Sequence, residues 1–285
     1  LGPALVPLAQ ARLHLPSEVR NFTDFLTSAS HFRRLGATVG LTPTFMSLPI
    51  AYHSRASSVR LEGDVHRPHV QSSDGETVSF RPSPEMDFEL EVGAYVGPGN
   101  ALGDPVRIGD ASRHLFGFCL LNDWSVRDIQ RWESVPLGPF QAKSLSTTIS
   151  PWVVTEEALR PFRTAALRRE ADELAPLAYL TSTDDQEQGG YDVGLEVLIS
   201  TRRMRDAGEP AHRLTSSNLR HLYWTFAQML THHSSNGCNM QPGDLLGSGT
   251  VSGPEPEARA CLAEITRRCE EVFTLPNGET RTWLE

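Results

Sequence analysis

The segment Leu121–Lys143, LNDWSVRDIQRWESVPLGPFQAK, begins where an apolar run over residues 115–121 stops at Asn122 and Asp123. Asparagine and aspartate are favoured helix N-caps, because their side chains accept hydrogen bonds from the first free backbone N–H groups. We therefore predict a helix that begins at this pair. Proline and glycine at residues 136–139 predict that the helix ends there and that a loop follows.

Four polar groups of different chemistry gather in this segment. On the predicted helix Asp123, Arg127 and Gln130 share a face, because residues three and four apart in a helix are neighbours. The loop returns the chain to the amine of Lys143. A carboxylate, a guanidinium, an amide and an amine could then converge on one site. Geometry alone leaves an alternative open, a surface ion pair between Asp123 and Arg127.

The composition is that of an ordinary folded chain, with 285 residues, 39% hydrophobic and 21% charged. The net charge of −9 argues against nucleic acid as a partner, because phosphate binding needs clustered lysine and arginine. No run reaches about 18 apolar residues, so we expect no membrane span and no membrane partner. Four cysteines without a C-x-x-C pair favour reduced thiols in a cytoplasmic protein.

Alternating apolar residues and turn signals indicate strands along most of the chain. Strands are expected at 86–96, 191–200 and 260–266, hairpin turns at Asp74-Gly75 and Asn277-Gly278, and a helix at 215–233 capped within 216–218. A short helix capped by Thr23 or Asp24 should carry His31. Helices do not alternate regularly with strands, so the expected fold class is mostly β with a few helices, α+β rather than a βαβ series.

The predicted strand at 86–96 carries a row of acids. Residues two apart in a strand point to one face, so Glu89 and Glu91 lie together, with Asp87 in the same register. Like charges on one face repel each other and call for a compensating cation. A solvent-facing acidic row is the alternative that spacing alone leaves open.

An all-oxygen cation site would combine Glu89 and Glu91 with Asp123 and Asp24. Such ligands suit Mg²⁺, Ca²⁺ or Mn²⁺, whereas zinc prefers histidine and cysteine. The chain has no G-x-S-x-G motif and no cysteine in an activating context, so hydrolysis would use water activated by a base. His31 is the best candidate, because imidazole exchanges protons near neutral pH. A surface histidine is the alternative.

Longer motifs resemble the fumarylacetoacetate hydrolase family over nearly the whole chain. They are Thr23-Asp24-Phe25 with His31, 52–58, 87–91, 96–100, 122–130, 132–140, Lys143-Ser144, 147–152, 231–234, 242–246 and 248–250. The resemblance implies a catalytic domain over residues 21–285, a mixed β-sandwich roll that acts as a homodimer. It also implies that residues 1–20 lead in from an SH3-like N-terminal domain outside this chain, and that a last C-terminal strand lies outside it too.

The resemblance assigns roles to residues of this sequence. It implies Mg²⁺ or Ca²⁺ held by Asp24, Glu89, Glu91 and Asp123, with Lys143 and Thr147 adjacent; a water-activating dyad of His31 and Glu264; an oxyanion group of Arg127, Gln130 and Lys143; and substrate contacts from Tyr52, Gln130 and Thr250. Three substrate positions depart from the family pattern. Leu26 and Ser134 stand where the family has tyrosine, and residues 36–46 lack an arginine that the family carries there.

The implied activity is metal-dependent hydrolysis of a carbon–carbon bond in a β-diketo acid. In the family's namesake reaction, the last step of tyrosine and phenylalanine breakdown, fumarylacetoacetate and water give fumarate and acetoacetate. The departures leave a second hypothesis open, in which the same fold and metal act on acylpyruvates or oxaloacetate as a hydrolase, decarboxylase or isomerase. A third is a non-catalytic β-domain protein stabilised by Ca²⁺, against which the intact His31 and Glu264 argue.

Overall fold

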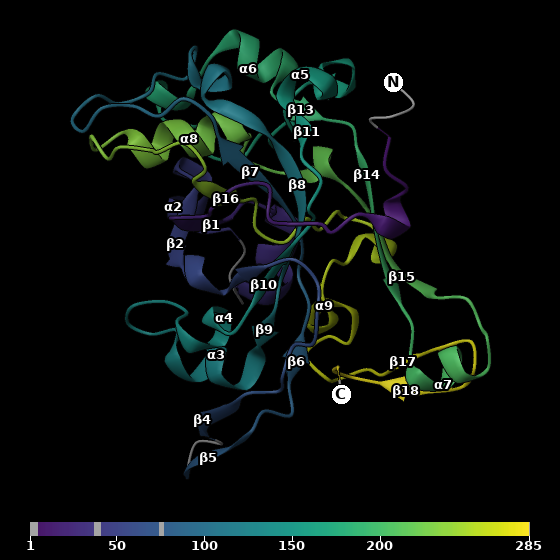
Figure 1. Cartoon of the computed structure of the whole chain (residues 1–285). Helices are drawn as coiled ribbons and strands as arrows, with labels where there is room; N and C mark the ends of the chain where they lie inside the picture. The colour runs from purple at the N-terminus through teal and green to yellow at the C-terminus, as the bar shows by residue number, and fades with distance from the viewer. Residues whose placement is uncertain (1–4, 37–40, 74–76, 285) are drawn as a thin grey trace.

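A computed structural model describes residues 5–36, 41–73 and 77–284, and among them an eight-stranded sheet forms the centre of the molecule (Figure 1). Its strands are β1 (Phe22–Leu26), β2 (Ile50–Ser54), β3 (Val59–Arg60), β7 (Leu90–Val96), β8 (Leu115–Asp123), β10 (Thr147–Ile149), β11 (Val154–Thr155) and β16 (Leu245–Gly247). The order is β2-β1-β16-β7-β8-β10-β3, with β11 also paired to β8. The pairs β1–β16 and β10–β3 are parallel, and the other pairs of this sheet are antiparallel.

Shorter strand pairs and short helices surround this sheet. The pairs are β4 (His69–Ser73) with β5 (Val78–Pro82), β6 (Met86–Asp87) with β9 (Ser125–Val126), β12 (Arg163–Thr164) with β13 (Gly190–Tyr191), β14 (Gly194–Ile199) with β15 (His212–Asn218), and β17 (Phe273–Thr274) with β18 (Thr280–Arg281). The helices are α1 (Ala29–His31), α2 (Pro43–Ser47), α3 (Arg127–Glu133), α4 (Gln141–Ser144), α5 (Glu156–Leu159), α6 (Thr183–Gln188), α7 (Arg202–Asp206), α8 (Phe226–Ser234) and α9 (Leu262–Ile265). The predicted fold class, strand-dominated α+β, is confirmed. Within the described ranges, no helix has the length and apolar character needed to cross a membrane.

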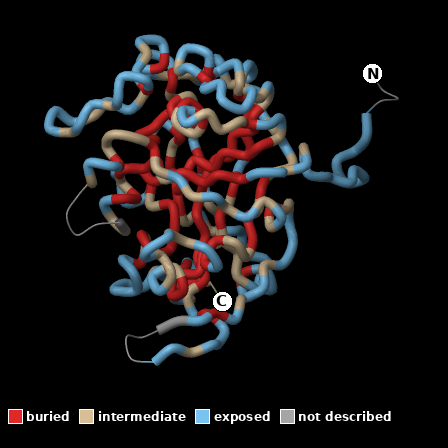
Figure 2. The backbone as a smooth tube through the Cα atoms, turned by 90° about the vertical axis from the view of Figure 1, so that its left-hand side faces the viewer, coloured by how far each residue is buried: buried red, intermediate tan, exposed pale blue. Residues whose placement is uncertain are grey.

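Both faces of the central strands are covered, which is why all seven residues of β7 are buried. On one face α8 packs Phe226 against Phe118 of β8, with ring centroids 4.9 Å apart in an edge-to-face arrangement. On the other face Phe22, Leu121 and Leu245 share a second apolar cluster. Figure 2 shows this buried centre in red, with the exposed N-terminal segment extending away from it.

The predicted helix at 215–233 is wrong in its first half. Residues His212–Asn218 form β15, because they pair along their length with β14. The helix α8 begins only at Phe226, where Thr225 and Gln228 form a capping box. Cross-strand pairing therefore overrode the apolar spacing from which the helix was predicted.

The prediction of a strand at 260–266 is also wrong, because Glu264 lies on the short helix α9. The backbone N–H groups of Leu262 and Ala263 donate to the carboxylate of Asp87, at 2.6 and 3.0 Å. An acid distant in sequence therefore satisfies the free donors at the start of this helix.

Two predicted helix caps lie on strands instead. Asp123 is the last residue of β8, paired with Thr147 of β10, and α3 begins only at Arg127. Asp24 lies in the middle of β1, and the side chain of Ser28 accepts from the N–H of His31 in its place. Asp123 and Arg127 are therefore not an ion pair one helical turn apart.

The other expectations on secondary structure are largely met. The strand expected at 191–200 occurs as β13 and β14, and the turn at Asn277-Gly278 joins β17 to β18. Asp74-Gly75 lies outside the described residues, although β4 and β5 on either side of it pair antiparallel. Residues 5–20 contain one regular element, a 3₁₀ turn at Leu8–Gln10. The assignment of this segment as a lead-in from another domain stays a prediction.

The packing of α8 on the sheet yields a stability prediction. Phe118→Ala should lower the free energy of unfolding by about 3–5 kcal/mol, because it leaves a cavity beside Phe226. Urea unfolding measures the change. Phe162→Ala is the matched control, since Phe162 is 51% exposed and should change stability by less than about 0.5 kcal/mol. Equal effects of the two substitutions would contradict this packing.

Candidate active site

The acidic side chains lie where the apolar rows of the sheet end. Asp24 follows Phe22 by two residues, and Asp123 follows Leu121 by two residues, so each acid points to the same face as a member of the second apolar cluster. Glu91 pairs with Leu121 across β7 and β8. Because residues two apart in a strand share a face, the apolar face of the sheet continues into a group of carboxylates at one end.

Three of these acids form one group. Carboxylate oxygens of Asp24, Glu91 and Asp123 lie within 4.8 Å of one another, and all three side chains are buried. Burial raises the pKa of Asp24 and of Glu91 well above the usual range, and the charges of neighbouring acids raise both further. Asp24 Oδ1 and Glu91 Oε1 are buried without a hydrogen-bond partner.

A glycine allows this close approach. Gly247 of β16 lies between β1 and β7, opposite Asp24. A Cβ at this position would lie 2.4 Å from Asp24 Oδ1 and 3.1 Å from Glu91 Oε2. Any side chain at residue 247 would therefore push the two carboxylates out of place.

Hydroxyl groups hold the outer oxygens of the group. The hydroxyl of Tyr52 donates to Asp24 Oδ2 at 2.7 Å and lies 3.0 Å from Asp123 Oδ2. Thr147 donates to Asp123 Oδ1 at 3.0 Å. Tyr52 therefore orders the carboxylates directly, in addition to lining the pocket where the resemblance placed a substrate contact.

Glu89 is outside this three-acid group, because two cations hold it. Its carboxylate pairs with Lys143 Nζ on one oxygen and with Arg127 at 2.8 Å on the other. Burial alone would raise the pKa of Glu89, but Lys143 and Arg127 hold it well below its usual range. Lys143 Nζ also lies 3.1 Å from Asp123 Oδ2, so it links Glu89 to the three acids.

Asp87 does not join the acidic row predicted at 87–91. The strand breaks between β6 and β7, and Asp87 pairs with Arg127, at 2.8 Å to Nε and 2.8 Å to the terminal nitrogen. The other terminal nitrogen of Arg127 donates to Gln130 Oε1 at 2.9 Å, which leaves the –NH₂ group of Gln130 to donate elsewhere.

His31 and Glu264 meet from opposite ends of the chain. His31 Nδ1 lies 2.6 Å from Glu264 Oε1, and both side chains are buried. Burial alone would raise the pKa of Glu264, but the hydrogen bond and charge of His31, with hydrogen bonds from Ser252 and Arg34, lower it to about 2. His31 Nε2 lies on the side of Glu89, 3.9 Å from Oε1, so the second ring nitrogen faces the acids.

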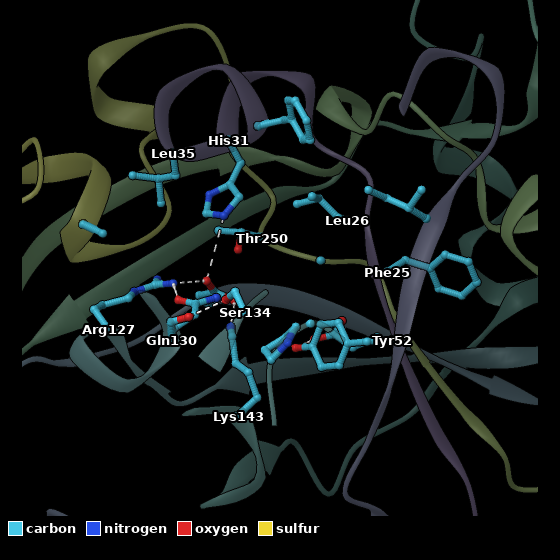
Figure 3. A pocket seen from close by; sticks show the side chains of 18 of the residues that line it. Phe25, Leu26, His31, Leu35, Tyr52, Arg127, Gln130, Ser134, Lys143 and Thr250 are labelled. Carbon is cyan, nitrogen blue, oxygen red and sulfur yellow. Dashed lines mark hydrogen bonds and ion pairs between the residues drawn. The ribbon is translucent and has the colours of Figure 1, made fainter. Parts of the chain in front are cut away.

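A cavity of about 560 Å³ collects these groups (Figure 3). His31 and Leu35 line one wall, and Tyr52 and Lys143 lie on the opposite side. The predicted site residues that line it are Asp24, Leu26, His31, Tyr52, Glu89, Glu91, Arg127, Gln130, Ser134, Lys143 and Thr250. Three further predicted residues contact this set without lining the cavity: Asp123 contacts Tyr52 and Lys143, Thr147 donates to Asp123, and Glu264 contacts His31. Residues 37–40 of the segment without an arginine lie outside the described residues.

Several residues of the site were missed by sequence reasoning. They are Asp87 as the partner of Arg127, Ser125 and Arg34 as partners of Lys143 and Glu264, Gly247 between the acids, and Arg131 and Arg268 in the pocket wall. Asp87 alone had a visible signal, its place in an acidic row. The others depend on contacts between segments distant in sequence.

Comparison with known families decides the class of the chain. The model described as fumarylacetoacetate (FAA) hydrolase C-terminal matches residues 20–272. The chain belongs to the fumarylacetoacetate hydrolase family. This agrees with the resemblance seen in its motifs.

Relatives within this family are similar over nearly the whole chain. The fumarylacetoacetase of Oryza sativa subsp. japonica is 44% identical over 99% of the chain, which covers 65% of that protein. The human fumarylacetoacetase is 42% identical over 99% of the chain, which covers 67% of that protein. The chain thus spans about two thirds of the length of these relatives.

Solved structures share the fold at lower identity. A 5-carboxymethyl-2-hydroxymuconate delta-isomerase from Mycobacterium smegmatis matches 86% of this chain and 73% of its own, with TM-score 0.51 and 17% identity. A fumarylpyruvate hydrolase from Pseudomonas aeruginosa, in complex with Mn²⁺ and pyruvate, matches 87% of this chain and 86% of its own, also with TM-score 0.51 and 17% identity. At these identities the likeness concerns the fold alone.

The lowered pKa of Glu264 predicts a pH dependence of stability. A carboxyl with a folded pKa of about 2 and an ordinary value of 4.5 contributes stability fully above pH 4.5, and loses it as the pH falls toward 2. The difference in unfolding free energy between the wild type and Glu264→Gln should therefore shrink as the pH falls below 4.5, by up to about 1.4 kcal/mol per pH unit. Urea unfolding from pH 7 to 3.5 tests this, and a constant difference throughout would contradict it.

Proposed function

We propose that this chain carries the active site of a metal-dependent hydrolase that cleaves the carbon–carbon bond of a β-diketo acid. The substrate we propose is fumarylacetoacetate, which with water gives fumarate and acetoacetate. One observation carries the proposal: the His31–Glu264 pair and a three-acid group share a pocket with the paired cations Arg127 and Lys143. The fumarylacetoacetase relatives support the choice of substrate.

The three acids suit a divalent cation. Asp24, Glu91 and Asp123 offer oxygen atoms only, and two of those oxygens are buried without a partner. Hard oxygen ligands favour Mg²⁺ or Ca²⁺, and Mn²⁺ also fits such a site. Glu89 is the fourth ligand that the resemblance implies, and it would have to share its oxygens with Lys143 and Arg127. When bound, the cation would supply positive charge next to the diketone oxygens.

His31 is the proposed base. Glu264 accepts the Nδ1 proton of the imidazole, which leaves Nε2 as the acceptor that faces the pocket. His31 Nε2 would take a proton from water as the oxygen of that water adds to a carbonyl carbon of the substrate. The buried carboxylate fixes this tautomer and stabilises the imidazolium that forms.

The cations would then stabilise the charge that develops on the attacked oxygen. Arg127 and Gln130 on α3, and Lys143 on α4, line the same pocket, and each carries N–H donors. Burial alone would lower the pKa of Lys143, but Asp123 and Glu89 raise it above its usual range, so the amine stays charged. Removing one oxyanion donor typically costs about 3 kcal/mol of barrier stabilisation. Cleavage of the carbon–carbon bond leaves its electron pair on the departing carbon, which takes the proton from His31.

A second function is favoured by two lining residues. Leu26 and Ser134 stand in the pocket where the family pattern has tyrosine, so the substrate side is altered. A shorter acylpyruvate is therefore the alternative substrate. Loss of diketone ultraviolet absorbance, followed with fumarylacetoacetate and then with acylpyruvates, with and without EDTA, separates the two. No turnover of any of them would favour the non-catalytic alternative. The homodimer, the cytoplasmic location and the place in tyrosine and phenylalanine breakdown stay predictions.

Removal of the base tests the mechanism. His31→Ala should lower kcat by at least about 100-fold, because proton transfer by a positioned base contributes that much or more, while calorimetric Mg²⁺ affinity stays within about twofold. His53→Ala, on the exposed side of β2, is the control and should retain full activity. Equal activity of His31→Ala and the wild type would refute the role of His31.

Steric crowding of the acids tests the cation site. Gly247→Ala should weaken Mg²⁺ or Mn²⁺ binding by at least about 10-fold, because its Cβ meets Asp24 and Glu91. Gly194→Ala, where a Cβ meets nothing within 4 Å, is the matched control and should bind as the wild type does. Glu91→Ala should abolish binding. Unchanged affinity in both Gly247→Ala and Glu91→Ala, measured by calorimetry, would exclude this site.

A further inference from the structure

One arginine in the pocket wall has no acidic partner among the described residues. Four cationic side chains line the cavity: Arg127, Arg131, Lys143 and Arg268. Arg127 and Lys143 pair with buried acids, and Arg131 makes two 2.7 Å contacts with Glu85.

Arg268 differs from these three. Its guanidinium donates to the backbone carbonyl of Leu35, and none of the ion pairs found within residues 5–36, 41–73 and 77–284 involves it. Its charge therefore remains available to an anion that enters the pocket.

The backbone that presents Arg268 is unusual. Arg267, Arg268 and Cys269 have φ values of 47°, 58° and 72°, and they are the non-glycine residues with positive φ in the described chain. Left-handed conformation is unfavourable for a residue with a Cβ, and three in succession must be held by their surroundings. Strain of this kind concentrates at functional sites.

Hydrogen bonds hold this left-handed turn against α9. The N–H of Arg268 donates to the carbonyl of Ala263 at 2.9 Å, and the buried Thr266 hydroxyl donates to the carbonyl of Leu262 at 2.8 Å. The same helix carries Glu264, which orients His31. The position of the Arg268 backbone is therefore fixed relative to the proposed base.

The second anchor of Arg268 comes from the segment of His31 itself. Leu35 follows His31 by four residues and lines the cavity beside it, on the side opposite Lys143 (Figure 3). Arg268 is thus bonded on the side of Leu35 and His31, whereas Tyr52 and Lys143, which contact Asp24 and Asp123, lie on the opposite side. A diketo acid with a carboxylate on its far end would meet Arg268 at that end.

We propose that Arg268 binds a terminal carboxylate of the substrate and thereby selects diketo acids that carry one. The inference rests on the proposed function and adds to it the residue that recognises the substrate. Guanidinium and carboxylate match each other in geometry and charge.

Steady-state kinetics with three substrates test the proposal. They are fumarylacetoacetate and its two monomethyl esters, each of which lacks one carboxylate charge. Arg268→Met should raise KM for fumarylacetoacetate by about 10- to 100-fold with kcat within about threefold, as expected for loss of a charged hydrogen bond. For one monoester the KM of Arg268→Met should equal that of the wild type, because its missing carboxylate is the one that Arg268 binds. Arg268→Lys should retain part of the affinity.

The matched control is Arg267→Met. Arg267 shares the left-handed backbone but pairs with Glu271 at 3.0 Å and does not line the cavity, so its kinetics should equal those of the wild type. The thermal midpoint of each variant establishes that it is folded. An unchanged KM in Arg268→Met, or an equal rise for all three substrates, would overturn the proposal.

Calorimetric binding of fumarate and of acetoacetate, which carry the two carboxylates of the substrate, gives a readout that does not require turnover. Arg268→Met should weaken binding of the product whose carboxylate Arg268 holds and leave the affinity for the other product unchanged. If the wild type turns over no diketo acid, the proposed function fails, and this comparison still decides whether Arg268 binds a carboxylate. Equal affinities of the wild type and Arg268→Met for both ligands would then refute it.

Discussion

Mutual repulsion among buried carboxylates is the constraint on which the rest of this structure depends. Asp24, Glu91 and Asp123 converge within 4.8 Å at the end of the sheet, and all three are buried. Burying a charge without a partner is costly, so such a group persists only if protons, hydrogen bonds or a cation compensate it. Tyr52 and Lys143 supply part of that compensation, and two oxygens remain for a ligand. Each acid lies on a different strand of one sheet, so the pairing of the strands fixes the acids relative to one another.

The same constraint explains the positions of the proposed catalytic groups. Glu89 lies beside the three acids but is neutralised by its own pair of cations, so it adds no further repulsion. Lys143 bridges Glu89 and Asp123, and therefore keeps its charge although it is buried. His31 faces this charged wall while Glu264 holds it from behind. The proposed base and the proposed cation site thereby lie on two sides of one pocket.

The sequence predicted the strand-rich fold, and it predicted which residues gather at one pocket better than it predicted their local structure. Short motifs name Asp24 and Asp123, but an aspartate caps a helix as readily as it ends a strand, so both were placed on helices. Glu264 was placed on a strand, because its helix exists through hydrogen bonds to Asp87, 175 residues earlier. The left-handed turn at Arg268 leaves no mark in the sequence, since no glycine or asparagine occupies it. Short sequence motifs thus indicate which residues form the candidate site, whereas contacts between distant segments determine the helix, strand or turn in which each residue lies.

Asp87 joins parts of the molecule that would otherwise be independent. Asp87 Oδ1 accepts a hydrogen bond from the backbone N–H of Leu262, at the start of α9. Asp87 Oδ2 accepts from Arg127 Nε at 2.8 Å and from the backbone N–H of Ala263, the next residue of α9. Arg127 belongs to the proposed oxyanion group, and α9 carries Glu264. A displacement of either element would therefore be transmitted to the other through a single carboxylate. A redesign that moves α3 alone would therefore also disturb the contact between His31 and Glu264, so the two elements would have to be engineered together.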